Sequence, residues 1–352
     1  MSSDTQMAGA AAALPRGRRL FGAMTATGRR GWIVSPLFDL LFFINIYWVV
    51  AFLPFYASAD GEPYIQFWMA YFLATPHRWL TLVVAATDRD RRYGQTWLFV
   101  VIAVLCALLI GGTLWVTGEF RSLFLFYTLL LGWHFAGQHS IILRIYSGQS
   151  DGGNARLEKW LPMIFVLYAN VRLIAFLEPM LRIGWFSALE TVDLVMLGIP
   201  IFMLGIEVVN FSWQRLPKLL YMLSFFSMWA SVLWSAHLHR DALCAVLLGA
   251  VTVYHSIEYL AMVSYYAWRR QEQGSQDLFQ TMARHWTLVF AWYVIGCGLL
   301  YSVGNALFVV ACYAVNTWAS LLHCFYDGIM WRMRDPETAN LFGVAAAPEN
   351  ST

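Results

Sequence analysis

The sequence predicts an all-α protein, a polytopic transmembrane helical bundle of about ten helices with both termini in the cytoplasm. Its 352 residues are 59% hydrophobic and only 12% charged, and the mean hydropathy is +0.56. A water-soluble domain does not need this much apolar surface. Apolar windows of membrane-spanning length recur along the whole chain, and its basic residues gather on alternate sides of them.

Each expected span is an apolar stretch of about 20 residues or more. The spans are 32–57, 64–86, 95–117, 122–146, 160–178, 190–210, 217–236, 242–268, 285–303 and 306–332. The chain then divides into a basic cytoplasmic tail (1–31), a transmembrane helical domain (32–333) and a short cytoplasmic tail (334–352). No soluble catalytic domain is left between the spans, so any chemistry is expected in or at the membrane.

The distribution of arginine and lysine supports this topology independently. With a cytoplasmic N-terminus, nearly all basic residues fall in inner loops or at inner helix ends, as the positive-inside rule requires. The residues outside are Arg121, Arg182 and Arg240, and Arg78 and Arg172 lie within spans. We therefore expect a multi-pass protein of a bacterial inner membrane. Its net charge of +2 reflects this topology and does not indicate a nucleic-acid partner.

The cysteines exclude two common kinds of site. They are Cys106, Cys244, Cys297, Cys312 and Cys324. All five fall inside expected spans and none form a CxxC pair, so neither a disulfide framework nor a zinc finger is predicted. They are expected to be small packing residues.

Polar residues inside the spans are costly in hydrocarbon and mark a functional site by default. Counted at about 1.5 Å per residue, eight of them fall roughly 8 to 20 Å from the cytoplasmic boundary. These residues are Asp39, His77, His134, His139, His255, Glu258, His323 and Asp327. Because five helices contribute to one depth, the side chains are expected to converge on a single site.

Spacing along each helix refines this expectation. His255 and Glu258 are three residues apart, about 60° around a helix, as in carboxylate-bridged bundles. His134 and Gln138 share a face, whereas His139 is about 140° round from His134. Both of these histidines can serve one cluster only if they bind different ions or if a π-bulge realigns them.

Each polar residue also has a structural interpretation. A lone intramembrane histidine such as His77 is often a hydrogen-bonded packing residue. For Asp39, capping or pairing near the inner surface is favoured over metal ligation. Glu258 can pair with His255, and Asp327 can pair with Arg332 or Arg334 at the interface. These interpretations, taken together, leave the common depth unexplained.

Imidazole and carboxylate ligands suit iron, zinc, manganese or copper rather than an iron–sulfur cluster. We predict a dinuclear non-haem iron site that faces the cytoplasm. The expected metal ligands are His77, His134, His139, His255, Glu258 and His323. Asp327, Gln138 and Asp39 are the expected catalytic residues, which orient ligands or relay protons.

The histidines on the cytosolic side of the bundle resemble those of histidine-rich integral-membrane non-haem iron oxygenases. Alkane hydroxylases, fatty-acid desaturases and bacterial β-carotene dioxygenases are of this type. The dense HxxxH and HxxHH boxes of the first two are absent, and the scattered single histidines are closer in style to the third. The resemblance covers architecture and ligand type, and the substrate and reaction are not carried over from it. A cytoplasm-facing iron site beside the lipid suits an oxygenase, hydroxylase or desaturase that acts on a hydrophobic or lipid-like substrate, with an electron-donor protein on the cytoplasmic side.

Two other functions stay open at this point. Histidines on separate helices also serve as axial ligands of haem b in electron-transfer membrane proteins. The same His, Glu and Asp side chains can form the relay of a proton-coupled transporter. His237 and His239, at the predicted outer face, are assigned to a polar turn rather than to this site.

Overall fold

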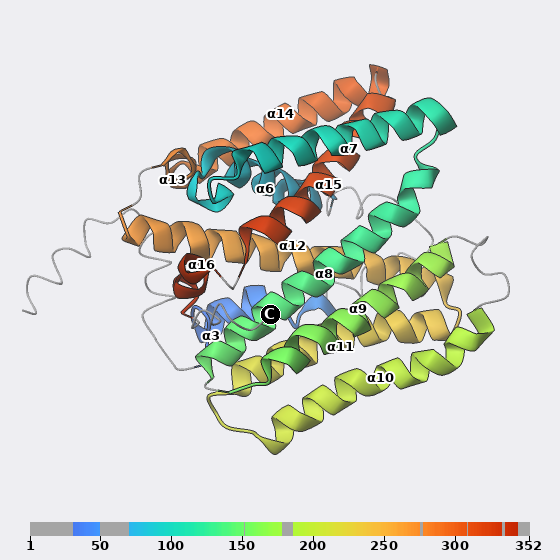
Figure 1. Cartoon of the computed structure of the whole chain (residues 1–352), viewed down its shortest axis with the longest axis vertical. Coiled ribbons are helices and arrows are strands. Elements are labelled where there is room, and N and C mark those ends of the chain that lie inside the picture. Colours follow the sequence, from blue (N-terminus) through green and yellow to red (C-terminus); the bar gives the residue numbers. More distant parts are fainter. Residues whose placement is uncertain are drawn as a thin grey trace, which may run out of the picture.

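The computed structural model describes residues 31–49, 70–150, 152–177, 186–274, 277–307, 309–332 and 335–343. Every regular element in these ranges is a helix (Figure 1). The basic tail expected over 1–31, parts of the first two expected spans and most of the C-terminal tail lie outside the described residues.

The helices differ in type and length. In chain order they are α3 (Pro36–Phe38), the π-helices η1 (Asp39–Phe43) and η2 (Ala70–Ala74), α6 (Thr75–Thr87), the 3-10 helix η3 (Asp90–Arg92), α7 (Thr96–Thr117), α8 (Arg121–Gln149), α9 (Ala155–Leu177), α10 (Phe186–Val209), α11 (Leu216–His237), α12 (Asp241–Glu272), α13 (Leu278–Arg284), α14 (Trp286–Leu307), α15 (Val309–Met330) and α16 (Pro336–Leu341).

Helix α12 runs through the middle of the bundle, between two groups of helices (Figure 1). One group contains α6, α7, α14 and α15, with α15 packed against the other three. The second contains α9, α10 and α11, and α11 packs against α12. Helix α8 packs against members of both groups, chiefly α9, α11 and α15. The helices α6, α8, α12 and α15 therefore meet inside the bundle.

Four helices in the described part of the chain are long and apolar enough to cross a bilayer. They are α7, α11, residues Leu189–Val209 of α10 and residues Ala242–Glu272 of α12. Helices α8 and α9 are as long, but buried polar side chains such as Gln138 and Arg172 lower their hydropathy. The all-helical bundle is confirmed, whereas ten spans and cytoplasmic termini stay predictions.

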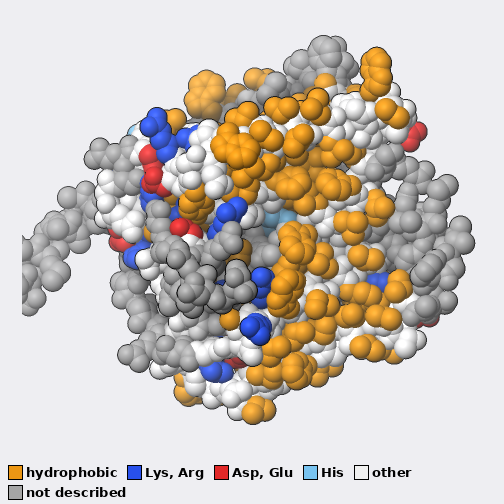
Figure 2. Space-filling view, in the orientation of Figure 1, with side chains coloured by type: hydrophobic (Ala, Val, Ile, Leu, Met, Phe, Trp, Pro, Cys, Tyr) orange, Lys and Arg blue, Asp and Glu red, His pale blue; other side chains and the backbone are white. Residues whose placement is uncertain are grey.

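The outer surface fits contact with lipid. Helix α7 exposes Val104, Leu108 and Trp115, and apolar side chains cover the middle of the face in Figure 2. Lysine, arginine and acidic side chains gather at the end that holds α13 and α16. A helix that is hydrophobic all round needs an apolar surrounding.

Two local features position the site. Pro76 lies in the first turn of α6, directly after the π-helix η2, where its missing N–H costs little. His77 therefore lies in the first turn of α6, three residues after the end of the π-helix. Helix α8 is α-helical from Arg121 to Gln149, so the π-bulge that would align His134 with His139 does not form.

Candidate metal centre

Four histidines from four helices form one buried cluster. They are His77 on α6, His134 on α8, His255 on α12 and His323 on α15, which we call the histidine cluster. Ring centroids lie 4.6 Å apart for His77 and His323, 4.5 Å for His134 and His323, and 4.7 Å for His134 and His255. His77 and His323, which are 246 residues apart in sequence, thus meet at one point.

Two sets of side chains are close enough to hold a metal ion. His77, His255 and His323 form one set, and His134, His323 and Asp327 form the other, with ligand atoms within 4.8 Å of one another in each. The Nε2 atoms of His134 and His255 are 3.1 Å apart. Two imidazole nitrogens that bind one ion tetrahedrally at about 2.0–2.1 Å lie roughly 3.3 Å apart. This pair, which shares a hydrogen bond in the structure, is therefore close to the spacing that a shared ion requires.

The hydrogen bonds of His77 fix which nitrogen keeps a lone pair. Its Nδ1 lies 3.1 Å from the Leu73 carbonyl and 2.9 Å from Ser256 Oγ. Ser256 donates its own proton to the Thr252 carbonyl at 2.7 Å, so both neighbours of Nδ1 act as acceptors. Nδ1 therefore carries the proton, and Nε2 is left as the metal-binding atom. Such outer hydrogen bonds orient the histidines of metal sites.

His323 is held in the same tautomer by a chain of hydroxyl groups. Its Nδ1 donates to Thr81 Oγ1 at 2.6 Å, Thr81 donates to Tyr259 Oη at 2.6 Å, and Tyr259 donates to Asp327 Oδ1 at 3.0 Å. Each group donates one proton, and the chain ends on a carboxylate. Asp327 Oδ2 lies 3.6 Å from His323 Nδ1 and 3.9 Å from His134 Nε2.

Several buried polar atoms of the site have no hydrogen-bond partner in the described chain. They are His323 Nε2, His255 Nδ1, Glu258 Oε1 and Gln138 Oε1. An unpaired buried acceptor costs about 1–3 kcal/mol, and native proteins keep few of them without a reason. A bound cation would satisfy the lone pair of His323 Nε2. The donor set of neutral imidazoles and a carboxylate thus fits a transition metal.

His139 lies apart from the histidine cluster. Trp229 Nε1 donates to its Nε2 at 3.2 Å, and its Nδ1 lies 3.0 Å from Tyr221 Oη. Because both ring nitrogens have protein partners, the ring is not available as a ligand in this arrangement. The 140° offset from His134 on a regular helix, calculated from sequence, explains the separation.

Glu258 and Gln138 form a pair next to the histidine cluster. Gln138 Nε2 donates to Glu258 Oε2 at 2.9 Å and to the His255 carbonyl at 3.2 Å. His139 Nδ1 is 3.5 Å from the same Glu258 oxygen. Glu258 is in neither candidate ligand set. The structure thus places it beside the cluster, linked to it through the backbone of His255.

Asp39 has a structural role in the turn before α3. Its Oδ2 accepts from the Ile33 amide at 2.7 Å and from Tyr146 Oη at 3.1 Å, and its Oδ1 accepts from Val34 at 3.0 Å and from Ser35 at 3.4 Å. Its carboxylate therefore fixes the turn before α3 and ties it to α8. The structure does not bring Asp39 to the histidine cluster.

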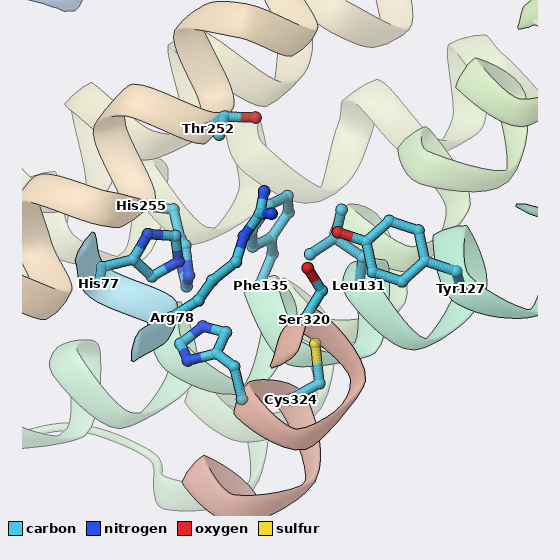
Figure 3. A pocket seen from close by; sticks show the side chains of 10 residues that line it. His77, Arg78, Tyr127, Leu131, Phe135, Thr252, His255, Ser320 and Cys324 are labelled. Atoms are coloured by element: carbon cyan, nitrogen blue, oxygen red, sulfur yellow. The ribbon is translucent and has the colours of Figure 1, made fainter. Parts of the chain in front are cut away.

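A cavity of about 30 Å³ adjoins the cluster. Figure 3 shows His77, His255, Arg78, Phe135 and Ser320 around it, and His323 also lines it. A site of this volume has room for about two water-sized groups. A small ligand can therefore reach the cluster from this side.

Sequence reasoning missed the hydroxyl groups that orient the histidines. Thr81 follows His77 by four residues and Tyr259 follows His255 by four, so each shares a helix face with a cluster histidine. A search for hydroxyl side chains four residues from each histidine would have found both. Ser256 directly follows His255 and serves the ring of another helix, which no spacing predicts.

The outer histidines belong to a different part of the molecule. His237 Nδ1 is 3.3 Å from Asp193 Oδ2, and His239 Nε2 is 3.1 Å from Glu190 Oε1. Both partners lie on α10. These contacts agree with a polar turn that is tied to a neighbouring helix.

No protein-family model, curated protein or solved structure matches the chain.

Proposed function

We propose that the protein is an integral-membrane, metal-dependent oxidoreductase of the oxygenase, hydroxylase or desaturase type. Its substrate is hydrophobic or lipid-like. The observation that carries the proposal is the histidine cluster, whose four buried imidazoles come from four helices and form, with Asp327, two sets of three side chains with ligand atoms within 4.8 Å of one another. Intramembrane ionisable groups of this kind are functional by default.

Packing alone is a poor explanation of the cluster. Buried polar groups in a purely structural network find partners, yet His323 Nε2 and His255 Nδ1 have none in the described chain. The outer hydrogen bonds of His77 and His323 go to Nδ1 in both rings. Because both rings carry their proton on Nδ1, the Nε2 atom of each ring keeps a lone pair that can bind a metal ion, as in metal sites.

Iron is the proposed metal. Imidazole and carboxylate ligands without thiolates suit non-haem iron, which supplies redox chemistry toward dioxygen when bound. The sequence favours two ions, and this stays a prediction. Both candidate ligand sets use His323, which favours a single ion among these residues.

The remaining polar residues would support such a centre. Asp327 accepts from Tyr259 and lies within 4 Å of two cluster histidines, so it can hold or pass a proton beside the ligands. Gln138 holds Glu258 in place. Both residues keep the catalytic assignment made from sequence as orienting or proton-relay groups.

The membrane gives the substrate its route. Figure 2 shows histidine side chains between the hydrophobic side chains of the apolar face, which supports access from the lipid. With both termini cytoplasmic in a bacterial inner membrane, the charged end at α13 and α16 would face the cytoplasm and an electron-donor protein.

Haem b is less favoured as the cofactor. Two axial histidines must stand on opposite sides of a flat porphyrin. In this structure the rings of the cluster contact one another edge to face, and the adjoining cavity is about 30 Å³. That packing leaves little room for a macrocycle between any two rings.

The test is elemental analysis with an absorption spectrum on protein purified in detergent. Stoichiometric iron without a Soret band is expected, and about two irons per chain would favour the dinuclear arrangement. His323→Ala and His77→Ala should each remove the metal. His285 is an exposed histidine outside the cluster, so His285→Ala is the control and should keep the metal.

Two results would overturn the proposal. Protein that stays free of transition metal after purification without chelators, and after reconstitution with ferrous iron, points to a proton-coupled transporter. A Soret band that is lost in His134→Ala points to haem.

A further inference from the structure

Arg78 lies on α6 beside His77, and its side chain lines the cavity next to the histidine cluster (Figure 3). It is half-buried, and its Nη1 donates to Asn316 Oδ1 at 3.5 Å. No described carboxylate lies within ion-pair distance of its guanidinium. An arginine at membrane depth is costly unless it is paired.

Two buried cations in the described helices are paired with carboxylates of the chain. Arg172 binds Asp193 through two nitrogens, each at 2.8 Å. Lys218 lies between Glu158 and Glu207. Arg78 differs from both, because the groups around it are the cavity and neutral side chains. The counter-charge for Arg78 is therefore expected from a ligand.

The other polar groups at the cavity define what that ligand meets. Thr252 and Ser320 donate their hydroxyl protons to backbone carbonyls four residues earlier, at 2.9 and 2.8 Å. They are therefore not free to donate to an anion. Tyr127 also lines the cavity and is half-buried. Among the arginine and hydroxyl side chains that line the cavity, Arg78 and Tyr127 are the donors that remain.

The size and polarity of the cavity limit the anion. About 30 Å³ accommodates about two water-sized groups, which matches the two oxygens of a carboxylate. A guanidinium binds a carboxylate through two parallel hydrogen bonds. Leu131 and Phe135 complete the lining and offer an apolar path for the atoms attached to that carboxylate.

We propose that this cavity binds the carboxylate of a long-chain carboxylic acid dissolved in the membrane, with Arg78 as the bidentate partner and Tyr127 as a second donor. The hydrocarbon chain leaves over Leu131 toward the apolar face. This assignment names the substrate class of the proposed oxidoreductase and rests on that function. It places the carbons nearest the carboxylate closest to His77 and His255.

The experiment measures binding of radiolabelled hexadecanoate to the full-length protein in phosphatidylcholine nanodiscs, with metal content determined on the same samples. Hexadecanol and methyl hexadecanoate are the uncharged competitors of equal chain length, and acetate is the short carboxylate. Hexadecanoate should bind at least about tenfold more tightly than either uncharged analogue, as a charged bidentate pair predicts. Acetate should compete only weakly.

Substitutions separate the contributions of Arg78 and Tyr127 to hexadecanoate binding. Arg78→Gln should weaken hexadecanoate at least about tenfold and leave hexadecanol unchanged, whereas Arg78→Lys should recover part of the loss because it keeps the charge without the planar fork. Tyr127→Phe should weaken hexadecanoate by a smaller factor, about threefold to tenfold. Both Arg78 variants should keep the metal content of the wild-type protein.

Equal binding of hexadecanoate and hexadecanol by the wild-type protein overturns the inference without any variant. Unchanged hexadecanoate binding in Arg78→Gln overturns the inference too. Tight acetate binding would mean that the ligand is a water-soluble carboxylate and would overturn the lipid assignment. If metal is present while carboxylate selectivity is missing, only this inference fails. If selectivity is present in metal-free protein, the proposed oxidoreductase fails instead.

Discussion

The most informative perturbation is Thr81→Val, which removes one hydroxyl and keeps the shape of the side chain. Thr81 Oγ1 accepts from His323 Nδ1 at 2.6 Å and donates to Tyr259 at 2.6 Å. The variant leaves the buried N–H of His323 without its acceptor, at a cost of about 1–3 kcal/mol. Loss of an outer partner of a ligating histidine lowers metal affinity about 10- to 100-fold.

The assay is a titration of apo-protein with ferrous iron against a competing chelator, with a thermal unfolding curve on the same sample. Thr113→Val is the matched control, because the Thr113 hydroxyl donates to a carbonyl of its own helix α7 at 2.8 Å and the side chain is only half-buried. The control should bind metal like the wild-type protein. Wild-type affinity in Thr81→Val would refute the claim that the hydroxyl chain orients His323.

Three further predictions address other parts of the site and fold. His139→Gln should keep the metal, because both of its ring nitrogens are hydrogen-bonded to the protein; loss of metal by elemental analysis would return His139 to the ligand set. Asp39→Asn should lower the free energy of unfolding by about 1–3 kcal/mol without changing metal content, as urea unfolding would show; equal stability would contradict the anchoring role. Lys218→Met leaves Glu158 buried without its cation and leaves Glu207 with only Arg215, at 3.8 Å, so it should cost about 3–5 kcal/mol; a wild-type unfolding curve would mean that these carboxylates are solvated.

Much of the site could be predicted from the sequence, because the expected depth of a residue follows from counting residues along its helix. A common distance from the cytoplasmic boundary suffices to predict that His77, His134, His255 and His323 meet, and these four do lie together. The rotation of each helix about its axis is set by packing, which no count of residues provides. His139 illustrates this, since it has the right depth and faces Tyr221 instead.

The roles of Asp39, Thr81 and Tyr259 could not be predicted, because they depend on hydrogen-bond partners outside the helix that carries each residue. Asp39 has the predicted depth, yet its carboxylate oxygens accept hydrogen bonds from three backbone amides before α3. Thr81 and Tyr259 resemble ordinary helix residues until α6, α12 and α15 come together. The count of ten spans depended on hydropathy, which buried polar side chains lower in α8 and α9.

The histidine cluster also bears on how the protein is made. Its members come from α6 near the start of the described chain and from α15 near its end. Folding therefore completes the cluster only when α15 packs against α6, and His77 and His323 are far apart in sequence. Because contacts of high sequence separation form slowly, the cluster is expected to assemble after the local helix pairs. A chain that stops before α15 would leave His77, His134 and His255 without His323.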